Sequence, residues 1–327
     1  MGDPAGIGGE LILKALERLA RSSIPVIIGD LCVLERLWSG LFQRKAPAFR
    51  PLHEGSPGSA EMVEASSMKD VRFGESDASC GQASYEYVLE ALRLLFSGEV
   101  AAVVTCPINK KSMSAAGVPF IGHTELLAHY GGAADYVMMM AAGPFRVSLA
   151  TIHVPLKEVP ALITPERVFK TIAVTARSLE GDFGIRAPRI KVCGVNPHAG
   201  EQGVMGTEEE AVREAIERAR QNDIRAEGPF PADSLFHKVD SDAYVAMYHD
   251  QGLIPVKTKA FARTVNITLG LPFVRTSVGH GTGLDIAGKG EADPSSLIEA
   301  YRVAESICAF RSRTASYYWG SAPPPQA

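Results

Sequence analysis

Long hydrophobic runs are missing from this chain of 327 residues. No apolar stretch approaches the roughly 20 residues that a membrane-spanning helix needs. The first residues also lack the basic and apolar segments of a secretory signal. We therefore expect a cytoplasmic protein that does not contact a membrane.

Cysteine is scarce, and an excess of basic charge is absent. The five cysteines are scattered and none belongs to a CxxC pair, which indicates reduced, mostly buried thiols: Cys32, Cys80, Cys106, Cys193 and Cys308. The net charge is −4 and the pI about 6.1, which argues against a general nucleic-acid binder.

What the sequence does contain is an alternation of helical and strand patterns, which favours an α/β fold. Residues 136–141 and 146–152 should form a hairpin, residues 44–82 should be irregular, and the tail from Gly320 should be disordered. A capping box is predicted at Thr207–Glu210. Helices are predicted at 10–20, 83–96, 207–221 and 295–310, and further strands at 25–29, 100–105, 190–195 and 244–248.

Three histidines, His153, His198 and His249, each follow a predicted strand. A single histidine is more often structural than a ligand. However, ligands of open α/β sheets gather at the carboxyl ends of the strands. Neutral imidazole suits zinc, cobalt, nickel and iron, and a catalytic metal keeps one position open. The shared placement therefore favours a divalent metal site.

A second group of polar residues fits an anionic ligand. His123 and Thr124 lie at a loop-to-helix junction, where they could cradle an anion or Thr124 could simply cap the helix. Lys257, Asn266 and Arg275 lie on three successive segments after His249. Most lone cations are solvated, but Lys257 and Arg275 are set within apolar segments, which favours phosphate binding.

Two glycine-rich stretches, residues 2–9 and 280–290, could approach a cofactor closely. The first leads into the first predicted helix, but it is not GxGxxG and no strand precedes it in this chain. The usual dinucleotide fingerprint is therefore absent.

Together these segments resemble the 4-hydroxythreonine-4-phosphate dehydrogenase family, NAD-dependent enzymes of pyridoxal phosphate biosynthesis. The resemblance implies an isocitrate/isopropylmalate dehydrogenase-like α/β fold, with two α/β/α domains and an intervening cleft. Domain one would comprise residues 1–120 and 277–327, on the cofactor side, and domain two residues 121–276. The resemblance also implies a homodimer with its active site at the subunit interface. It runs in order through residues 1–8, 122–125, 196–201, 248–252 and 265–272.

The resemblance also implies residue roles. One divalent ion (zinc, magnesium, cobalt or manganese) would be bound by three histidines, one of them from the partner subunit: His153, His198 and His249. The phosphorylated substrate would be held by His123, Thr124, Lys257, Asn266 and Arg275. The loop with Asp285, Gly288 and Lys289 is similar to the adenosine-binding loop of decarboxylating dehydrogenases, so NAD could bind without GxGxxG. No arginine stands in that loop to meet a 2′-phosphate, which favours NAD over NADP.

The implied reaction oxidises 4-phosphohydroxy-L-threonine to a 3-oxo acid, which decarboxylates to 3-amino-2-oxopropyl phosphate. Zinc lowers the pKa of bound water from about 15.7 to roughly 7. A similar shift on an alcohol would amount to about 12 kcal/mol, whereas one lysine hydrogen bond contributes about 1.5–3 kcal/mol. The metal is therefore assigned as the Lewis acid. Lys257 is the candidate proton relay, and Asp233 and Asp250 are carboxylates that could orient the ligands.

The chain departs from the family pattern in two places. A strand precedes residues 1–4 in the family, so either the start lies upstream or the sheet lacks a strand. Gly279 stands where the commonest family form has Asp, which leaves open a dehydrogenase for threonate or erythronate 4-phosphate. A diol-acid dehydrogenase without substrate phosphate is less favoured, because all five proposed phosphate-binding residues are present. A phosphate acyltransferase of similar architecture would have no need of three metal-directed histidines. A metal-dependent hydrolase would use the histidines but leave the loop at Asp285 unexplained.

Overall fold

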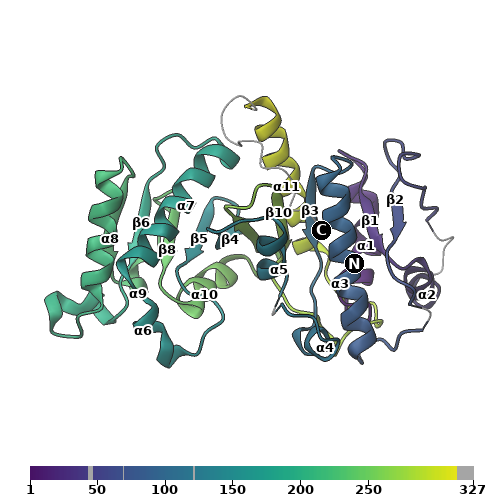
Figure 1. Ribbon diagram of the computed structural model, residues 1–327, viewed down its shortest axis with the longest axis horizontal. Coiled ribbons are helices and arrows are strands. Elements are labelled where there is room, and N and C mark those ends of the chain that lie inside the picture. The colour runs from purple at the N-terminus through teal and green to yellow at the C-terminus, as the bar shows by residue number, and fades with distance from the viewer. Residues whose placement is uncertain (43–46, 69, 121, 315–327) are drawn as a thin grey trace. The chain divides into compact units, whose positions relative to one another are not determined.

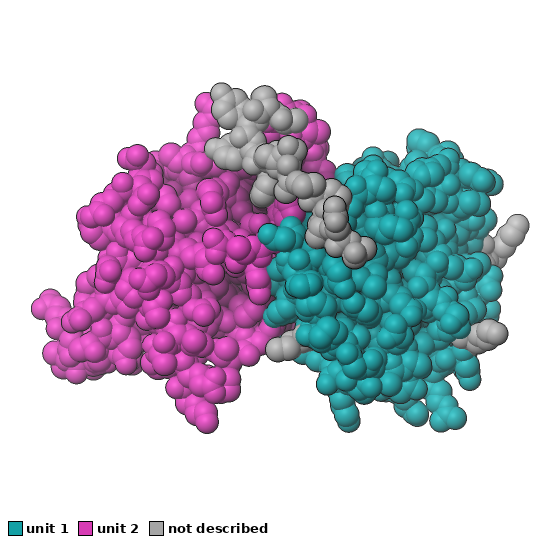
Figure 2. Space-filling model, viewed as in Figure 1, with its two compact units in different colours: residues 1–132, 273–305, 323–327 teal, residues 133–272, 306–322 magenta. Residues whose placement is uncertain are grey.

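The computed structural model describes residues 1–42, 47–68, 70–120 and 122–314, so the tail expected to be disordered lies outside the described residues. The chain forms two compact units (Figure 2). Among the described residues, unit 1 contains Met1–Gly132 and Phe273–Glu305, and unit 2 contains Ala133–Pro272 and residues 306–314. The domain boundaries expected after residues 120 and 276 stay a prediction, because compactness alone does not define functional domains.

Unit 1 holds two parallel strand pairs, β1 with β2 and β3 with β10. Its core packs α1 and α2 through Leu11, Leu34 and Leu37 and also includes Val278 and Leu297. Its elements, seen in Figure 1, are α1 (Gly8–Leu19), β1 (Val26–Gly29), α2 (Leu31–Leu41), β2 (Glu61–Glu64), α3 (Ala78–Phe96), β3 (Ala102–Thr105), α4 (Lys110–Ala115), α5 (His123–Tyr130), β10 (Val274–Val278) and the start of α11 (Ser295–Arg313).

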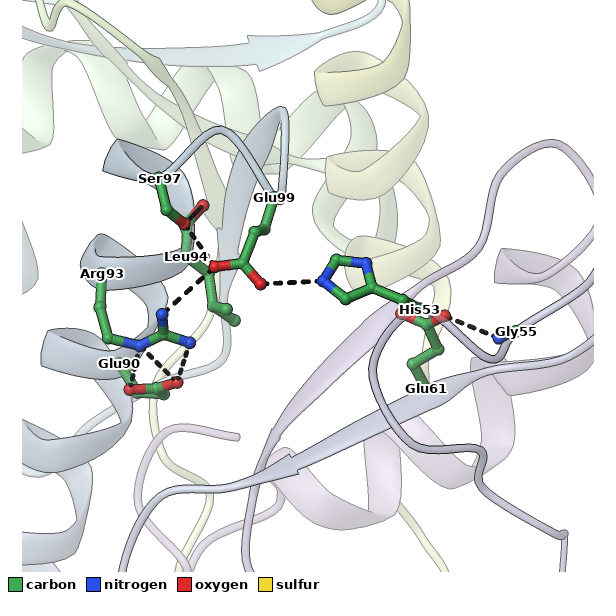
Figure 3. A network of polar contacts seen from close by, with 8 residues as sticks. All are labelled: His53, Gly55, Glu61, Glu90, Arg93, Leu94, Ser97 and Glu99. Atoms are coloured by element: carbon green, nitrogen blue, oxygen red, sulfur yellow. Dashed lines mark hydrogen bonds and ion pairs between the residues drawn. The ribbon is translucent and has the colours of Figure 1, made fainter.

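A surface network joins the turn before β2 to the connection between α3 and β3 (Figure 3). His53 Nε2 lies 3.0 Å from Glu99 Oε2, and Glu99 Oε1 accepts hydrogen bonds from Arg93 Nη1 and Ser97 Oγ at 3.2 and 2.6 Å. The Ser97 hydrogen bond, with help from His53 and Arg93, lowers the pKa of Glu99. Glu61 Oε1 accepts from Gly55 N at 2.8 Å and closes the same turn.

Unit 2 contains the strand order β9-β4-β5-β8-β6-β7. β4 is antiparallel to β5 and β9, whereas β5, β8, β6 and β7 run parallel. The elements are β4 (Val137–Ala142), β5 (Phe145–Leu149), η1 (Leu156–Glu158), α6 (Val159–Leu162), α7 (Pro165–Phe183), β6 (Ile190–Cys193), η2 (Pro197–Gly203), α8 (Glu209–Gln221), β7 (Ala226–Phe230), α9 (Ala232–Leu235), β8 (Ala243–Ala246), α10 (His249–Ala260), η3 (Phe261–Arg263) and β9 (Val265–Leu269).

Helices cover both faces of the unit 2 sheet. Along β8, Tyr244 belongs to the cluster that contains Leu253 of α10. Its neighbour Val245 belongs to the cluster that contains Ile172 of α7 and Ile216 of α8. Because successive side chains of a strand point to opposite faces, the sheet lies between two helical layers. All four β8 residues are buried, as expected for a parallel strand covered on both faces.

Several sequence-based predictions are confirmed, among them the mixed α/β dehydrogenase-like fold and the hairpin of β4 and β5. Other predictions were wrong. Residues 44–82 contain β2 and the start of α3, where Asp77 accepts a hydrogen bond from Cys80 N at 3.0 Å. The capping box at Thr207 does not form, because α8 begins after Glu208 without a side-chain cap.

The helix α7 was not predicted, although its sequence carries helix signals. The N-cap residue Thr164 accepts a hydrogen bond from Arg167 N, Pro165 occupies the first turn, and Gly184 ends the helix at a φ of 69°. The five cysteines are free thiols, and Cys80, Cys106 and Cys193 are buried. Among the described residues, none of the helices combines the length and apolar composition that crossing a bilayer requires.

Candidate active site

The three candidate metal ligands follow three neighbouring parallel strands of unit 2. His153 comes after β5, His249 after β8 and His198 after β6, and β8 pairs with both of the other strands. Parallel strands end at the same edge of a sheet, so the three segments that carry the histidines leave the sheet at one edge. Their role as metal ligands stays a prediction.

Two of the three imidazoles lie side by side. The ring centroids of His153 and His249 are 5.8 Å apart with an interplanar angle of 44°. His249 is the first residue of α10, and its Nδ1 lies 2.7 Å from Asp250 Oδ1. That contact fixes the ring through Nδ1 and leaves Nε2 to face a ligand, the arrangement of a carboxylate-oriented metal ligand.

The third imidazole does not join this pair. His198 is exposed on η2, where it lines a cavity of about 550 Å³ together with Glu201, Arg213 and Pro231. Among the residues that the structure describes, no group of three His, Cys, Asp or Glu side chains is arranged to hold a metal. The three-histidine site therefore stays a prediction, and one that includes a ligand from a partner subunit.

Two side chains outside the predicted site hold the strand ends in register. Thr151 Oγ1, buried beside the first histidine, donates to Met247 O at 2.7 Å. Gln251, two residues after His249, accepts from Met247 N at 2.7 Å and donates to Gly194 O at 2.8 Å. These bonds connect the segments that lead to all three histidines.

The chemistry of this rim fits a divalent ion in part. Two imidazoles with adjacent rings, one of them oriented by a carboxylate, form half of a tetrahedral nitrogen ligand set. A catalytic site of this kind needs a third protein ligand, which would have to come from elsewhere, and leaves its fourth position open. The described residues of a single chain thus provide two imidazole ligands that suit a divalent ion, but not a complete metal site.

Unit 1 holds three of the expected anion-binding residues. His123 and Thr124 are the first two residues of α5 and are 8% and 7% exposed. The N-cap is Gly122, which makes no side-chain cap, so a capping role for Thr124 is excluded. Unpaired amides at a helix amino end attract anions.

Arg275 is a buried cation of the same unit. It is 3% exposed on β10, and its Nη2 donates to Thr105 Oγ1 at 2.9 Å. Burial lowers its pKa to about 10, and the nearby Glu125 carboxylate opposes that shift. Burial, and then the positive charges of Arg275 and of the N-terminal amine, hold the pKa of His123 well below 6.5. A neutral His123 can donate one hydrogen bond to an anion.

Unit 2 carries the other polar candidates. Lys257, half-buried on α10, holds its Nζ 5.7 Å from the centre of the Phe261 ring. Asn266 lies on β9, and within the described residues its buried Oδ1 has no hydrogen-bond partner. Asp233 is exposed on α9. An unsatisfied buried amide is costly, which makes Asn266 a candidate for contact with a ligand.

The candidate cofactor loop is anchored from α1. Glu10, fully buried, accepts from Gly290 N at 3.2 Å and Ala292 N at 2.8 Å. Lys14 Nζ donates to the carbonyl oxygens of the same two residues at 2.7 and 2.8 Å. These hydrogen bonds fix the end of the loop. Two of the expected cofactor contacts, Asp285 and Lys289, are exposed.

Gly288, the third expected cofactor contact, is fixed by packing. It has a φ of 73°, and a Cβ there would come within 3.0 Å of Phe73 Cβ. The loop therefore has a defined backbone at this point, which a side chain would disturb.

Known proteins resemble this chain over most of its length. Residues 21–304 match the family described as pyridoxal phosphate biosynthetic protein PdxA. A 4-hydroxythreonine-4-phosphate dehydrogenase of Ruegeria sp. (strain TM1040) is 44% identical over 324 residues, which cover 95% of this chain and 96% of that protein.

Solved structures show the same relation. The crystal structure of 4-hydroxythreonine-4-phosphate dehydrogenase from Klebsiella pneumoniae superposes with a TM-score of 0.84 at 37% identity, covering 94% of this chain and 98% of that one. A terephthalate 1,2-cis-dihydrodioldehydrogenase from Burkholderia xenovorans LB400 has a TM-score of 0.63 at 32% identity, covering 94% and 96%. The match in sequence and in structure shows that this chain belongs to the PdxA family of pyridoxal phosphate biosynthetic proteins.

Proposed function

We propose that this chain uses NAD to oxidise 4-phosphohydroxy-L-threonine to a 3-oxo acid, which then loses carbon dioxide to give 3-amino-2-oxopropyl phosphate. The observation that carries the proposal is the adjacent pair His153 and His249, placed at parallel strand ends. The pair lies in a chain whose relatives are named dehydrogenases of this phosphate ester. The chain is accordingly an oxidoreductase acting on a hydroxyl group.

In this proposal the buried polar groups hold the substrate. Arg275 and the amino end of α5, with His123 and Thr124, would bind the phosphate, because a guanidinium fork and helix amides match its oxygens. Lys257 would contact the phosphate and relay the hydroxyl proton. The buried amide oxygen of Asn266, which has no hydrogen-bond partner among the described residues, would accept a hydrogen bond from the substrate.

A divalent ion bound by the histidines would polarise the hydroxyl oxygen as a Lewis acid. Zinc, magnesium, cobalt and manganese are the candidates. Asp250 would hold the His249 ring in place, and Asp233 would orient another ligand. NAD would lie against the loop with Asp285, Gly288 and Lys289.

We further propose that two copies of the chain form a homodimer that completes the metal site. Exposed apolar residues follow each of the three candidate ligands: Leu156 (70% exposed), Val204 (81%), Ile254 (63%) and Phe261 (62%). Such residues are costly in water and typical of an interface. His198, which lies outside the pair, would then be the ligand that one copy supplies to the other.

The competing functions are less well supported. An acyltransferase has no use for the paired imidazoles, and a hydrolase has no use for the cofactor loop. A sugar-acid phosphate dehydrogenase is disfavoured because relatives at 40–44% identity share the hydroxythreonine phosphate name. The free cysteines suit a reducing compartment, so we place the activity in the cytoplasm.

NADH formation tests the proposal directly. The full chain is incubated with NAD, cobalt or magnesium, and 4-phosphohydroxy-L-threonine, with threonate and erythronate 4-phosphates as a parallel panel. We expect NADH with the aminated substrate and its loss with EDTA. NADH from the sugar acids alone would replace the substrate assignment, and phosphate release without NADH would replace the reaction.

A further inference from the structure

The turn that carries His198 has an uncommon backbone conformation. Five consecutive residues, His198 to Gln202, have positive φ angles of 53°, 52°, 75°, 41° and 59°. Four of these residues are not glycine, and L-residues adopt this left-handed region only at an energetic cost. Strain of this kind persists only where surrounding contacts impose it, and it concentrates at functional sites.

One buried carboxylate holds the two residues that precede Pro197 and the turn. Glu209, 1% exposed on α8, accepts from Val195 N at 2.9 Å and Asn196 N at 2.6 Å through Oε1. Its Oε2 accepts from Asn196 Nδ2 at 3.0 Å. The carboxylate therefore binds the two backbone amides directly before Pro197 and His198.

The turn itself packs on the same carboxylate. A Cβ at Gly200 would lie 2.5 Å from Glu209 Oε2, and a Cβ at Gly194 would lie 2.7 Å from Ala199 Cα. The middle of the turn therefore fits against the end of β6 and against Glu209, whereas His198 is left exposed to face a ligand.

We propose that Glu209 is a positioning residue that presents His198 to the metal. An amide in place of the carboxylate keeps one oxygen for Val195 N and Asn196 N, but it sets a nitrogen donor against the Asn196 Nδ2 donor. The segment before the turn is then held less well, and the left-handed turn relaxes toward the commoner right-handed conformations. The imidazole then samples many orientations, and binding the ion must order it again. The inference rests on the proposed metal site.

A purely structural role for Glu209, as a carboxylate at the amino end of α8, predicts a different result. Its loss would lower the melting temperature and leave the affinity of the folded protein for metal unchanged. Metal affinity, measured on folded protein, therefore separates the two roles.

The first experiment compares Glu209→Gln with Glu210→Gln. Both remove one negative charge from the same helical turn, but Glu210 is exposed. Co²⁺ is titrated into the full chain, followed by calorimetry and by the visible absorption of the bound ion. We expect a 10- to 100-fold weaker affinity and an altered absorption spectrum for Glu209→Gln, as for other residues that orient metal ligands. For Glu210→Gln we expect less than a twofold change.

A second pair of variants tests the same contact without touching the carboxylate. Both Gly200 and Gly203 have positive φ angles, 75° and 95°, but a Cβ at Gly203 meets nothing within 4 Å. Gly200→Ala should displace Glu209 and weaken Co²⁺ binding at least fivefold more than Gly203→Ala. This pair carries the test if Glu209→Gln does not fold.

The outcomes separate the inference from the proposed function. Weak Co²⁺ binding by Glu209→Gln and Gly200→Ala, beside normal binding by their controls, supports the positioning role. If the wild-type chain binds Co²⁺ and both variants bind it equally well, the positioning role is wrong and the metal site stands. If the wild-type chain does not bind Co²⁺, the proposed metal site itself is wrong, and the role of Glu209 falls with it.

Discussion

The histidine rim of unit 2 and the anion-binding residues of unit 1 are built in opposite ways. His153 is exposed and the His249 side chain is 37% exposed, whereas His123 and Arg275 are 8% and 3% exposed. Because the imidazoles are exposed, a metal ion bound to them could also take a ligand from another chain. Burial instead fixes His123 and Arg275 before any ligand arrives. In the proposed function, assembly would therefore complete the metal site, whereas folding alone would prepare the phosphate contacts.

The largest expected effect comes from breaking the histidine rim. His249→Ala removes one of the two adjacent imidazoles, so kcat should fall at least ~1,000-fold, because the Lewis acid accounts for several kcal/mol of the barrier. NADH formation and Co²⁺ titration measure the loss. The matched change Asp250→Asn only releases the ring, and we expect it to weaken metal affinity about 10- to 100-fold. Full activity of His249→Ala would remove this histidine from the site.

A conservative change at the buried cation tests the other side of the comparison. Arg275→Lys keeps the charge but loses the planar fork, so kcat/KM for the phosphorylated substrate should fall about 10- to 100-fold, equivalent to ~1.5–3 kcal/mol. Arg72→Lys is the control, because the Arg72 side chain is 80% exposed. Inorganic phosphate should inhibit the wild type more strongly than Arg275→Lys. Equal inhibition of both proteins would contradict the assignment.

The pH dependence of stability reports on the buried His123. His123 stays neutral in the folded chain because its pKa is held well below 6.5, mainly by burial. The unfolded chain takes up a proton near pH 6.5, so stability is lost as the pH falls below that value. The free energy of unfolding should fall by up to about 1.4 kcal/mol for the first pH unit.

Urea unfolding between pH 7.5 and 5.5 measures this slope. His123→Gln should remove the His123 contribution, whereas His129→Gln, an exposed histidine of the same helix, should leave the slope as it is. Identical slopes for all three proteins would show that His123 is protonated in the folded state.

The smallest effect is expected at the exposed candidate cofactor loop. Asp285→Asn would weaken the proposed hydrogen bond to the cofactor, so the KM for NAD should rise about 3- to 10-fold, from a loss of ~0.5–1.5 kcal/mol. Glu291→Gln, an exposed change in the same segment, is the control. A rise in the KM for the phosphorylated substrate instead of NAD would reassign the loop.

Local sequence patterns were sufficient for much of this architecture. The hairpin of β4 and β5 follows from two apolar runs around Gly143-Pro144, and the placement of the histidines follows from each standing a few residues after a strand. Helix α7 carries local signals too, because Thr164, Pro165 and Gly184 mark its ends in the sequence. These features depend on residues that are close together along the chain, so the sequence alone is sufficient to predict them.

The misassignment at Thr207 has another cause. The run of carboxylates there matches a capping box, but Glu209 points inward to amides 13 and 14 residues earlier in the chain. Likewise, the sequence shows Gln251 only as one polar residue of a motif. The structure shows that its side chain hydrogen-bonds to Met247 after β8 and to Gly194 after β6, and so connects the two strand ends.

The sequence by itself determined the α/β alternation, the histidines at the strand ends and the membership of the family, because periodicity and motif order are properties of the chain. Tertiary structure alone decided that His153 and His249 lie together while His198 lies apart. It also decided that Arg275 is buried. Ring separations and burial depend on how distant strands and helices pack, and no local pattern encodes that packing.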